Sequence, residues 1–395
     1  MKIIASILCS MFALFFIANS AWGQMKADSD FLHSDSLSND TLFAKQKNGV
    51  NKKKKRKHGK CHRFFKNFNQ IDTTYVTPNY YNFTAMLQQT CLVNAYSISG
   101  KNASGDKQQI NFYSKPRLTL GPYLGWHWFF LGYNFDIVRA YKSNKSTQFN
   151  FSVYSSTFGA DIIYQKNNGD FTIDNIEGFG KQNDKRVKDV EFDGLKTSIR
   201  SINVYYIFNH KRFSYPAAYS QSTIQRKSCG TWKIGFIYSH QTLDFDHNRF
   251  TSSLISEDGN NIGIYDELKF DKINYYDYSI NFGYAYNWVF APNFLCSVSL
   301  APAVGYKFAK GESFESQDLL FKRHNLNFDA IGRFGFVWNT NRLFAGASAI
   351  VHAYNYNKSK FSISNAVAVF NVYCGINFVP KGHYRRSNPA RFKKW

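Results

Sequence analysis

The most constraining feature of the sequence is a two-residue alternation of apolar and polar side chains over long segments. From Tyr276 to Phe290, every second residue is aromatic or Ile. The alternate positions from Asp277 to Asn287 are occupied by Asp, Ser, Asn, Gly and Ala. Eight successive matches to a period of two exclude a helix, whose period is 3.6 residues. The alternation recurs in 326–338, 343–353 and 366–378. It predicts β-strands with one apolar and one polar face.

The length of these segments bears on the kind of sheet. Several run about 15 residues, against about five or six for an ordinary strand, and an oblique bilayer crossing takes about 9–11. Aromatic residues make up 18 % of the chain although the mean hydropathy is −0.40, because the two faces of each strand cancel in the average. Trp232, Trp288 and Trp338 near strand ends suit an interfacial aromatic girdle. We expect an all-β fold, an antiparallel transmembrane β-barrel. The alternative is a large soluble β-sandwich with its aromatics inside.

The alternating segments give about 12 strands, within a range of 10–14. An even number places both termini on one side of a closed barrel, which we assign to the periplasm. The expected strands are 82–98, 110–126, 128–139, 147–156, 157–166, 197–208, 231–245, 274–290, 293–308, 323–339, 342–357 and 361–378.

The connections between these strands are expected to alternate in length. Residues 291–293 and 339–341 become tight periplasmic turns, and 167–196, 246–273 and 309–322 become outward loops. The segment 209–230 is long, yet parity places it on the periplasmic side. We expect it to fold into the lumen as a plug, to cap the mouth or to dock a partner, unless the strand count is wrong. Its candidate contact residues are Arg212, Phe213, Tyr215, Pro216, Tyr219 and Gln221.

The N-terminus reads as an export signal. Lys2 precedes an apolar stretch from Ile3 to Ala18, and Ala21-Trp22-Gly23 offers small residues at the cleavage positions. We expect a signal peptide over 1–23, a basic, flexible periplasmic linker over 24–70, an outer-membrane barrel over 71–379 and a basic tail over 380–395. The expected location is the outer membrane of a Gram-negative envelope.

The formal charge of +22 is concentrated in the two arms. Residues 24–70 contain 12 Lys or Arg against 4 Asp, and residues 380–395 contain 6 Lys or Arg and no acid. Polybasic segments of an exported chain meet anionic lipid or cell-wall polymer rather than nucleic acid. The other expected partners are outer-membrane lipid and the barrel assembly machinery. Solvated arms without a partner are the alternative.

The cysteines and histidines indicate no cofactor or metal. The mature chain has an odd five Cys at wide spacings, without a C-x-x-C pair, which does not suggest a disulfide framework. His58, Cys61 and His62 form a compact cluster, but it has no second pair of ligands and lies in a lysine run.

Charged residues on the polar strand faces predict a network inside the lumen. Both signs are present, so ion pairs and hydrogen bonds within the barrel are expected rather than solute selection. A barrel of about twelve strands lies between side-chain-filled and open barrels, so it is closed, plugged or narrowly conducting. The predicted lumen residues are Arg117, Asp136, Asp161, Asp277, Asp329 and Arg333.

One pair of residues suggests enzyme chemistry on the lipid face. His240 and Thr242 are two apart on one strand, as a base and a hydroxyl nucleophile of a membrane-embedded lipid hydrolase would be. A nucleophile needs a base within hydrogen-bond reach and a third group to orient that base. The sequence offers no third group, and Thr replaces the usual Ser, so an interfacial His without catalysis is the favoured interpretation.

The chain resembles a family of uncharacterised exported bacterial proteins, domain of unknown function 4421. The resemblance rests on YYIFNHKRFSYPAAYSQS at Tyr205–Ser222 and RKSCG at Arg226–Gly230, with support from Tyr80–Thr90 and Gly121–Tyr133. It covers roughly residues 70–380. It implies an outer-membrane-type barrel and transfers no catalytic or binding residues. The leading hypothesis is a barrel that passes or binds a solute or has a structural role in the envelope. A lipid-modifying hydrolase and a partner-docking barrel are the alternatives.

Overall fold

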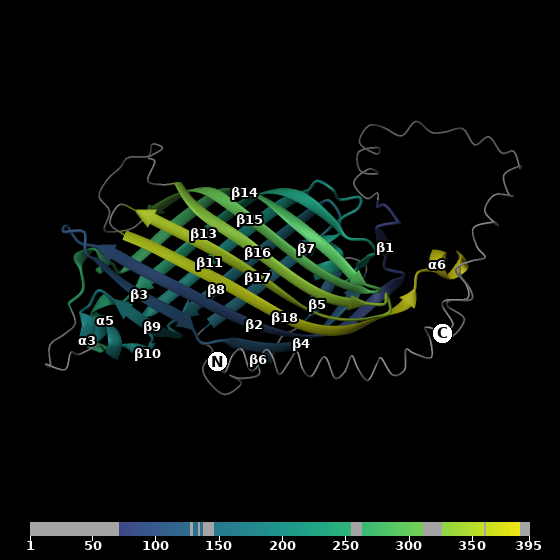
Figure 1. The fold of residues 1–395 in the computed structure, drawn as a ribbon. Coiled ribbons are helices and arrows are strands. Elements are labelled where there is room, and N and C mark those ends of the chain that lie inside the picture. The colour runs from purple at the N-terminus through teal and green to yellow at the C-terminus, as the bar shows by residue number, and fades with distance from the viewer. Residues whose placement is uncertain are drawn as a thin grey trace, which may run out of the picture. The chain divides into compact units, whose positions relative to one another are not determined.

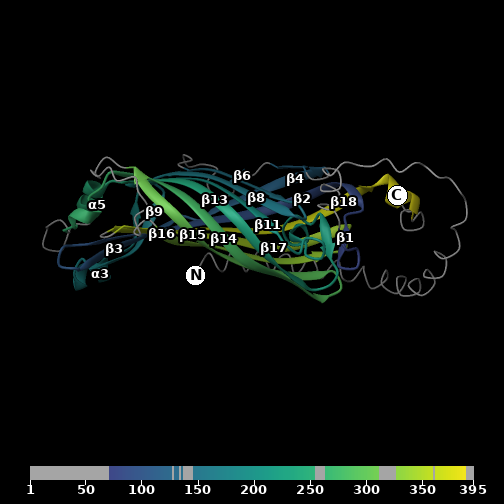
Figure 2. The ribbon, with the colours of Figure 1, turned by 90° about the horizontal axis from the view of Figure 1, so that it is seen from above.

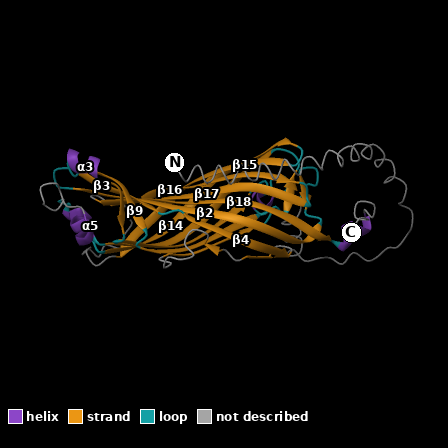
Figure 3. Ribbon diagram, turned by 90° about the horizontal axis from the view of Figure 1, so that it is seen from below, coloured by secondary structure: helices purple, strands orange, loops and turns teal. Residues whose placement is uncertain are grey.

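The computed structural model describes residues 71–126, 129–132, 135–136, 146–253, 263–310, 326–358 and 361–387. They are dominated by one antiparallel sheet that curls strongly on itself (Figures 1 and 2). Figure 3 shows how little of the described chain is helical. The predicted all-β antiparallel fold is confirmed. The signal peptide, the linker, the end of the C-terminal tail and the His58–His62 cluster lie outside the described residues.

The large sheet contains 16 strands. Taking β3–β4 and β5–β6 as two interrupted strands, and setting aside the β9–β10 hairpin, twelve described strands run between its two ends. The strands are β2 (Tyr81–Lys101), β3 (Lys107–Ser114), β4 (Arg117–Trp126), β5 (Phe129–Gly132), β6 (Phe135–Asp136), β7 (Ser146–Tyr154), β8 (Phe158–Asn168), β9 (Phe171–Glu177), β10 (Lys188–Phe192), β11 (Leu195–Ile207), β13 (Cys229–Phe245), β14 (Lys272–Ala291), β15 (Phe294–Lys310), β16 (Leu326–Asn339), β17 (Leu343–Lys358) and β18 (Phe361–Pro380).

Neighbouring strands pair in one continuous order around the curled sheet. From β2 the order is β18, β17, β16, β15, β14, β13, β11, β8 and β7, while β4, followed by β5 and β6, pairs with the first half of β2. The described residues of β6 and β7 form no ladder with each other. Across that seam the Arg117 guanidinium on β4 donates to the Ser146 carbonyl on β7 (Nη1–O 3.2 Å).

The alternation of the sequence appears as alternating burial, with the polar face inside. On β14, Asp277, Ser279 and Asn281 are buried, while Ile280 and Phe282 between and beside them are more than half exposed. Large apolar side chains point outward in the same way on β13, β15 and β16. The alternative of a soluble sandwich with its aromatics inside is therefore wrong, because these side chains cover the outer surface of the curled sheet.

The two ends of the curled sheet differ. At one, which we call the terminal end, β2 begins and β18 ends; the opposite one is the loop end. At the terminal end β14 and β15 meet in a tight turn at Pro292-Asn293, and β16 and β17 meet around Asn341. Both Asn residues have positive φ, 67° and 77°, a conformation that Asn tolerates better than most residues.

Two expected segments differ in detail from the structure. The expected strand 110–126 is divided into β3 and β4 at Lys115-Pro116, since Pro has no N–H to donate to a ladder. Residues 167–196, expected as a loop, contain the β9–β10 hairpin, and β9 pairs with β3. The hairpin forms because Phe171, Ile173 and Phe192 are buried in an apolar cluster.

That cluster, the loop-end cluster, is the largest apolar core of the described chain. It joins the β3–β9–β10 extension to β11, β13, β14 and β18 and lies between their inward faces. Around Phe245, which lies within 6.1 Å of four other rings, the rings pack edge to face or tilted. Members include Ile98, Phe112, Phe171, Ile173, Phe192, Phe245, Phe250, Phe270 and Ile363.

The helices of the described chain are short. None has the length and apolar character needed to cross a membrane. Three lie at the loop end, one lies at the terminal end, and α6 follows β18. They are α3 (Lys181–Arg186), α4 (Tyr215–Tyr219), α5 (His247–Ser253), the 3-10 turn η1 (Asp266–Leu268) and α6 (Gly382–Ser387).

Candidate functional site: the occluded lumen

Residues 208–228, which we call the plug, pack against the inner wall at the terminal end. Ser214 begins α4, and its hydroxyl oxygen accepts a hydrogen bond from the Ala217 amide at 3.3 Å. Pro216 lies in the first turn, where its missing N–H costs nothing. After α4 the plug continues into β12 (Thr223–Gln225), which pairs with β1 (Val76–Pro78) in a separate two-stranded sheet across this end (Figure 1).

The plug buries its apolar side chains against the inner wall. Phe213, Tyr215, Ala217 and Ala218 are buried, and the Tyr215 ring meets that of Tyr205 on β11 at 5.7 Å. Complete burial of a side chain as large as that of Phe213 stabilises the folded protein by about 1.5–3 kcal/mol. The plug is therefore a packed part of the barrel interior.

Polar side chains attach the plug to three strands of the wall. The Tyr215 hydroxyl donates to Ser299 Oγ on β15 (2.8 Å), and Asn287 Nδ2 on β14 donates to the Ser214 carbonyl (2.9 Å). Gln221 Nε2 donates to the Tyr373 hydroxyl on β18 (2.7 Å). Burial raises the pKa of Tyr215 to about 12, so this hydroxyl keeps its proton at neutral pH. These bonds hold the plug in one orientation.

The six plug residues singled out from sequence have different surroundings. Phe213, Tyr215, Pro216 and Gln221 are buried inside the mouth, and Tyr219 is half-buried with its ring stacked on Tyr154 at 5.6 Å. Arg212 points outward, and its side chain is 56 % exposed beside Asp72 (Nε–Oδ2 3.5 Å). The segment thus has an inner apolar side and an outer charged side.

One buried ion pair lies in the lumen near the plug. Arg333 on β16 pairs with Asp161 on β8 across the lumen, and neither side chain is more than 4 % exposed. The carboxylate also accepts from Asn203 Nδ2 (2.9 Å) and from Ser152 Oγ (2.8 Å). The guanidinium lies over the Tyr205 ring, 5.1 Å from its centroid. These bonds satisfy most of the pair's polar atoms, which a buried pair needs to offset its desolvation.

A second charged cluster lies farther toward the loop end. Lys307 Nζ on β15 is 2.6 Å from Asp329 Oδ1 and 3.8 Å from Asp277 Oδ2, and all three side chains are fully buried. Lys307 also donates to the Asn355 carbonyl at 2.8 Å. The Ser279 hydroxyl donates to Asp277 at 2.5 Å. Four predicted lumen residues thus form two separate clusters.

Two cations of the lumen were missed in the sequence analysis. Lys307 lies on the same strand face as Ala303 and Gly305, and Lys233 lies on the same face as Thr231 and Gly235. Strand parity was therefore sufficient to place both lysines inside. Lys233 is buried with its Nζ 5.4 Å from the Tyr205 ring centroid and 5.6 Å from that of Tyr215. Within the described ranges it has no carboxylate within 4 Å. The buried formal charges of these ranges are three cationic and three acidic.

The two remaining lumen predictions are placed at the seam. Arg117 is half-buried and bridges to β7 through Ser146, as described above. Asp136 belongs to β6, where its backbone pairs with Thr119, and its side chain lies outside the described part.

His240 and Thr242 share a strand face without being joined. The Thr242 hydroxyl donates to Asn274 Oδ1 at 2.8 Å, and the His240 ring stacks on Tyr276 at 4.4 Å. No hydrogen bond links the two side chains in this described part of β13. Since a nucleophile needs its base within hydrogen-bond reach, the pair does not form an activated dyad here.

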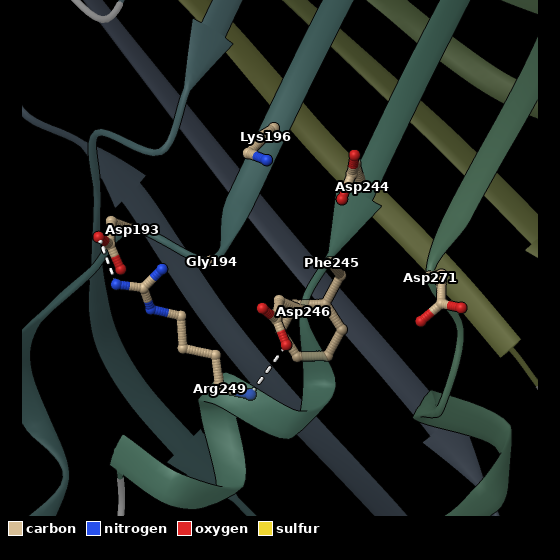
Figure 4. Close-up of a pocket in the computed structure, with 8 residues that line it drawn as sticks. All are labelled: Asp193, Gly194, Lys196, Asp244, Phe245, Asp246, Arg249 and Asp271. Atoms are coloured by element: carbon tan, nitrogen blue, oxygen red, sulfur yellow. Dashed lines mark hydrogen bonds and ion pairs between the residues drawn. The ribbon is translucent and has the colours of Figure 1, made fainter.

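An acidic pocket of about 320 Å³ lies at the loop end (Figure 4). Asp193 pairs with Arg249 (Oδ2–Nη2 2.8 Å), and Asp246 accepts from the Arg249 backbone amide (2.9 Å) at the start of α5. Asp244 and Asp271 also line the pocket. Within the described ranges, no three His, Cys, Asp or Glu side chains are arranged to hold a metal ion. The pocket is best described as a capped helix start with an ion pair.

Comparison with known proteins yields a family and distant structural neighbours. A family model described as "Domain of unknown function (DUF4421)" matches residues 70–378. No curated protein matches the chain significantly.

Among solved structures, the outer membrane protease OmpT from Escherichia coli is similar at 8 % identity and TM-score 0.32, covering 77 % of this chain and 98 % of that one. The translocator domain of autotransporter NalP from Neisseria meningitidis is similar at 8 % identity and TM-score 0.25, covering 80 % and 96 %. OprG from Pseudomonas aeruginosa is similar at 8 % identity and TM-score 0.24, covering 76 % and 98 %. Likeness of this degree carries no argument about activity.

Proposed function

The chain belongs to the domain of unknown function family DUF4421, and on that premise we propose that it is an outer-membrane β-barrel with a closed lumen and a structural or docking role in the envelope. The observation that carries the proposal is the occlusion of the lumen from both ends. An open pore needs a continuous polar path, and the packed plug at one end and the apolar loop-end cluster at the other support a closed one.

The outer surface supports the membrane part of the proposal. Ile280, Leu300 and Phe328 are at least 60 % exposed, and each faces away from the lumen. Exposing such a surface to water is costly, since each Å² of apolar area is worth about 25 cal/mol. Facing lipid, the same side chains are in a favourable environment, and the buried polar lumen matches the interior of an outer-membrane barrel.

The decisive experiment is single-channel recording. The purified full-length protein is added to a planar bilayer and compared with an open porin under the same conditions. We expect the porin to give conductance steps and this protein to give none at any applied voltage. Stable ohmic steps from the wild-type protein would overturn the closed-lumen proposal. Cell fractionation, with shifted gel mobility of the unheated protein, tests the location independently.

A further inference from the structure

The outward side of the plug carries a concentration of positive charge, which we call the basic face. Among the described residues of the terminal end, Asp72 is the only acidic side chain outside the lumen. The cations are exposed and come from both the plug and α6. The members of the basic face are Lys211, Arg212, Arg226, Lys227, Arg385 and Arg386.

The plug cations of the basic face are gathered around one ring. Tyr75 lies between Arg212 and Lys227, whose charged groups are 5.1 and 5.6 Å from its centroid. Arg226 is held by a hydrogen bond from its Nε to Thr77 Oγ1 at 2.9 Å. Hydrogen bonds from Thr74 lower the pKa of Asp72, so this carboxylate stays ionised and offsets only part of the charge of Arg212. The face is therefore strongly and permanently cationic.

The loop end provides a contrast. Residues 166–196 there contain six Lys or Arg and seven Asp or Glu. Ion pairs such as Lys115–Glu191 and Arg249–Asp193 neutralise part of that charge locally. The net positive charge of the described body is thus concentrated at the terminal end. A long-range field of one sign attracts a polyanion.

We propose that the basic face binds a carboxylate-bearing polymer of the cell wall, such as peptidoglycan, beneath the outer membrane. This inference rests on the proposed function, together with the expectation from strand parity that both termini face the periplasm. Arg226 bonds to Thr77 of β1. Arg212 and Lys227 lie near Tyr75, just before β1, at the terminal end of the curled sheet (Figure 2). Lipid head groups surround the apolar outer wall, whereas a periplasmic polymer meets the mouth directly. The position therefore favours the polymer over anionic lipid.

The chain outside the described structure extends the same charge. The described chain begins at Ile71, next to Asp72, whose amide donates to the Lys211 carbonyl at 2.8 Å. The sequence before it includes KKKKRKHGK at 52–60, and the sequence after α6 includes Arg391, Lys393 and Lys394. In the sequence, both basic stretches therefore adjoin segments of the terminal end.

The test uses co-sedimentation of the detergent-solubilised, full-length protein with purified peptidoglycan sacculi. The face variant combines K211E, K227E and R385E, whose side chains make no hydrogen bond to the rest of the described protein. The control variant combines K181E, K185E and K188E on and beside α3 at the loop end. Both variants change the net charge equally, and all six positions are exposed.

We expect the wild type and the control to sediment with sacculi, and the face variant to bind at least about tenfold more weakly. Binding should also fall steeply between low salt and 0.5 M salt, at about which the Debye length is only a few Å. Equal loss in both variants, unchanged binding of the face variant, or no binding by the wild type would each overturn the inference. Binding to anionic vesicles but not to sacculi would overturn it in favour of lipid.

The outcome is separable from that of the conductance experiment. A conducting protein that binds sacculi through the basic face would refute the closed-lumen proposal alone. A closed protein that fails to sediment would refute only the polymer-binding inference.

Discussion

The two ends of the curled sheet are filled in physically different ways. At the loop end, inward side chains of the strands meet side chains of α5, η1 and the connecting loops in an apolar cluster around Phe245. At the terminal end, a separate segment is inserted, and its attachments include directional hydrogen bonds such as Tyr215–Ser299 and Gln221–Tyr373. Opening the first requires breaking up a large apolar cluster to which many elements contribute. Opening the second requires breaking side-chain bonds while the strand ladders remain intact.

This difference indicates where the barrel is able to change state. Elements that move are drawn from the regions of lower local stability, whereas the core opens only with global unfolding. The plug also lies over an unpaired buried cation, Lys233, whereas the Lys307 cluster toward the loop end pairs its cation with two carboxylates. We expect substitutions at the two ends to separate global stability from local opening.

The largest effect is expected at the loop end, for Phe245→Ala. The change removes a ring that packs against Phe112, Phe192, Phe250 and Phe270, and cavities of this kind cost about 3–5 kcal/mol. Urea unfolding in lipid vesicles, followed by tryptophan fluorescence, measures the loss. The control is Phe236→Ala on the lipid-facing side of the same strand, where a smaller loss is expected. Equal losses would show that the loop end is not a packed closure.

An effect of opposite sign is expected beneath the plug, for Lys233→Met. Desolvation of a buried ion costs several kcal/mol, and attraction to two aromatic rings returns about 2 kcal/mol. Replacing the ammonium by an apolar side chain of similar length should therefore stabilise the barrel by about 1–2 kcal/mol. The same unfolding assay measures it, with exposed Lys196→Met expected to change stability by less than about 0.5 kcal/mol. A destabilised Lys233→Met protein would mean that the ammonium holds the plug closed.

The smallest effect is expected for Tyr215→Phe, which removes the plug's hydrogen bond to Ser299. A lost hydrogen bond of this kind costs about 1 kcal/mol, equivalent to about a fivefold larger open population of the plug. Limited proteolysis within 208–228 reports that population, and the unfolding assay should show a loss of no more than about 1 kcal/mol. Tyr284→Phe, on the lipid-facing side of β14, is the matched control. Unchanged cleavage would show that packing alone retains the plug.

Much of the barrel wall was predictable from the sequence, and particular residues show why. The facing of Asp277, Asp329 and Arg333 follows from strand parity, because the pleat alternates residue by residue. The β9–β10 hairpin was not predicted, since Phe171, Ile173 and Phe192 become buried only when β3 and β11 surround them. Lys233 and Lys307 were missed although the same parity places them inside.

The plug shows the limit of local reasoning most clearly. Pro216 and the loss of alternation indicated that 209–230 is not a strand, but a plug, a cap and a docking segment remained equally open. Its position is decided by the partners of Tyr215, Gln221 and Ser214, which lie 73 to 152 residues away in the chain. Such contacts leave no local signature.

The sequence by itself determined the strand period, the inward and outward faces and the concentration of positive charge in the two arms. These properties depend on neighbouring residues and on backbone geometry alone. The tertiary structure decided that Arg333 meets Asp161, that Lys307 meets Asp277 and Asp329, and that Tyr215 of the plug meets Ser299 on the wall. Those pairings depend on the register and curvature of many strands together, because two inward residues meet only when the sheet brings their strands to opposite sides of one lumen.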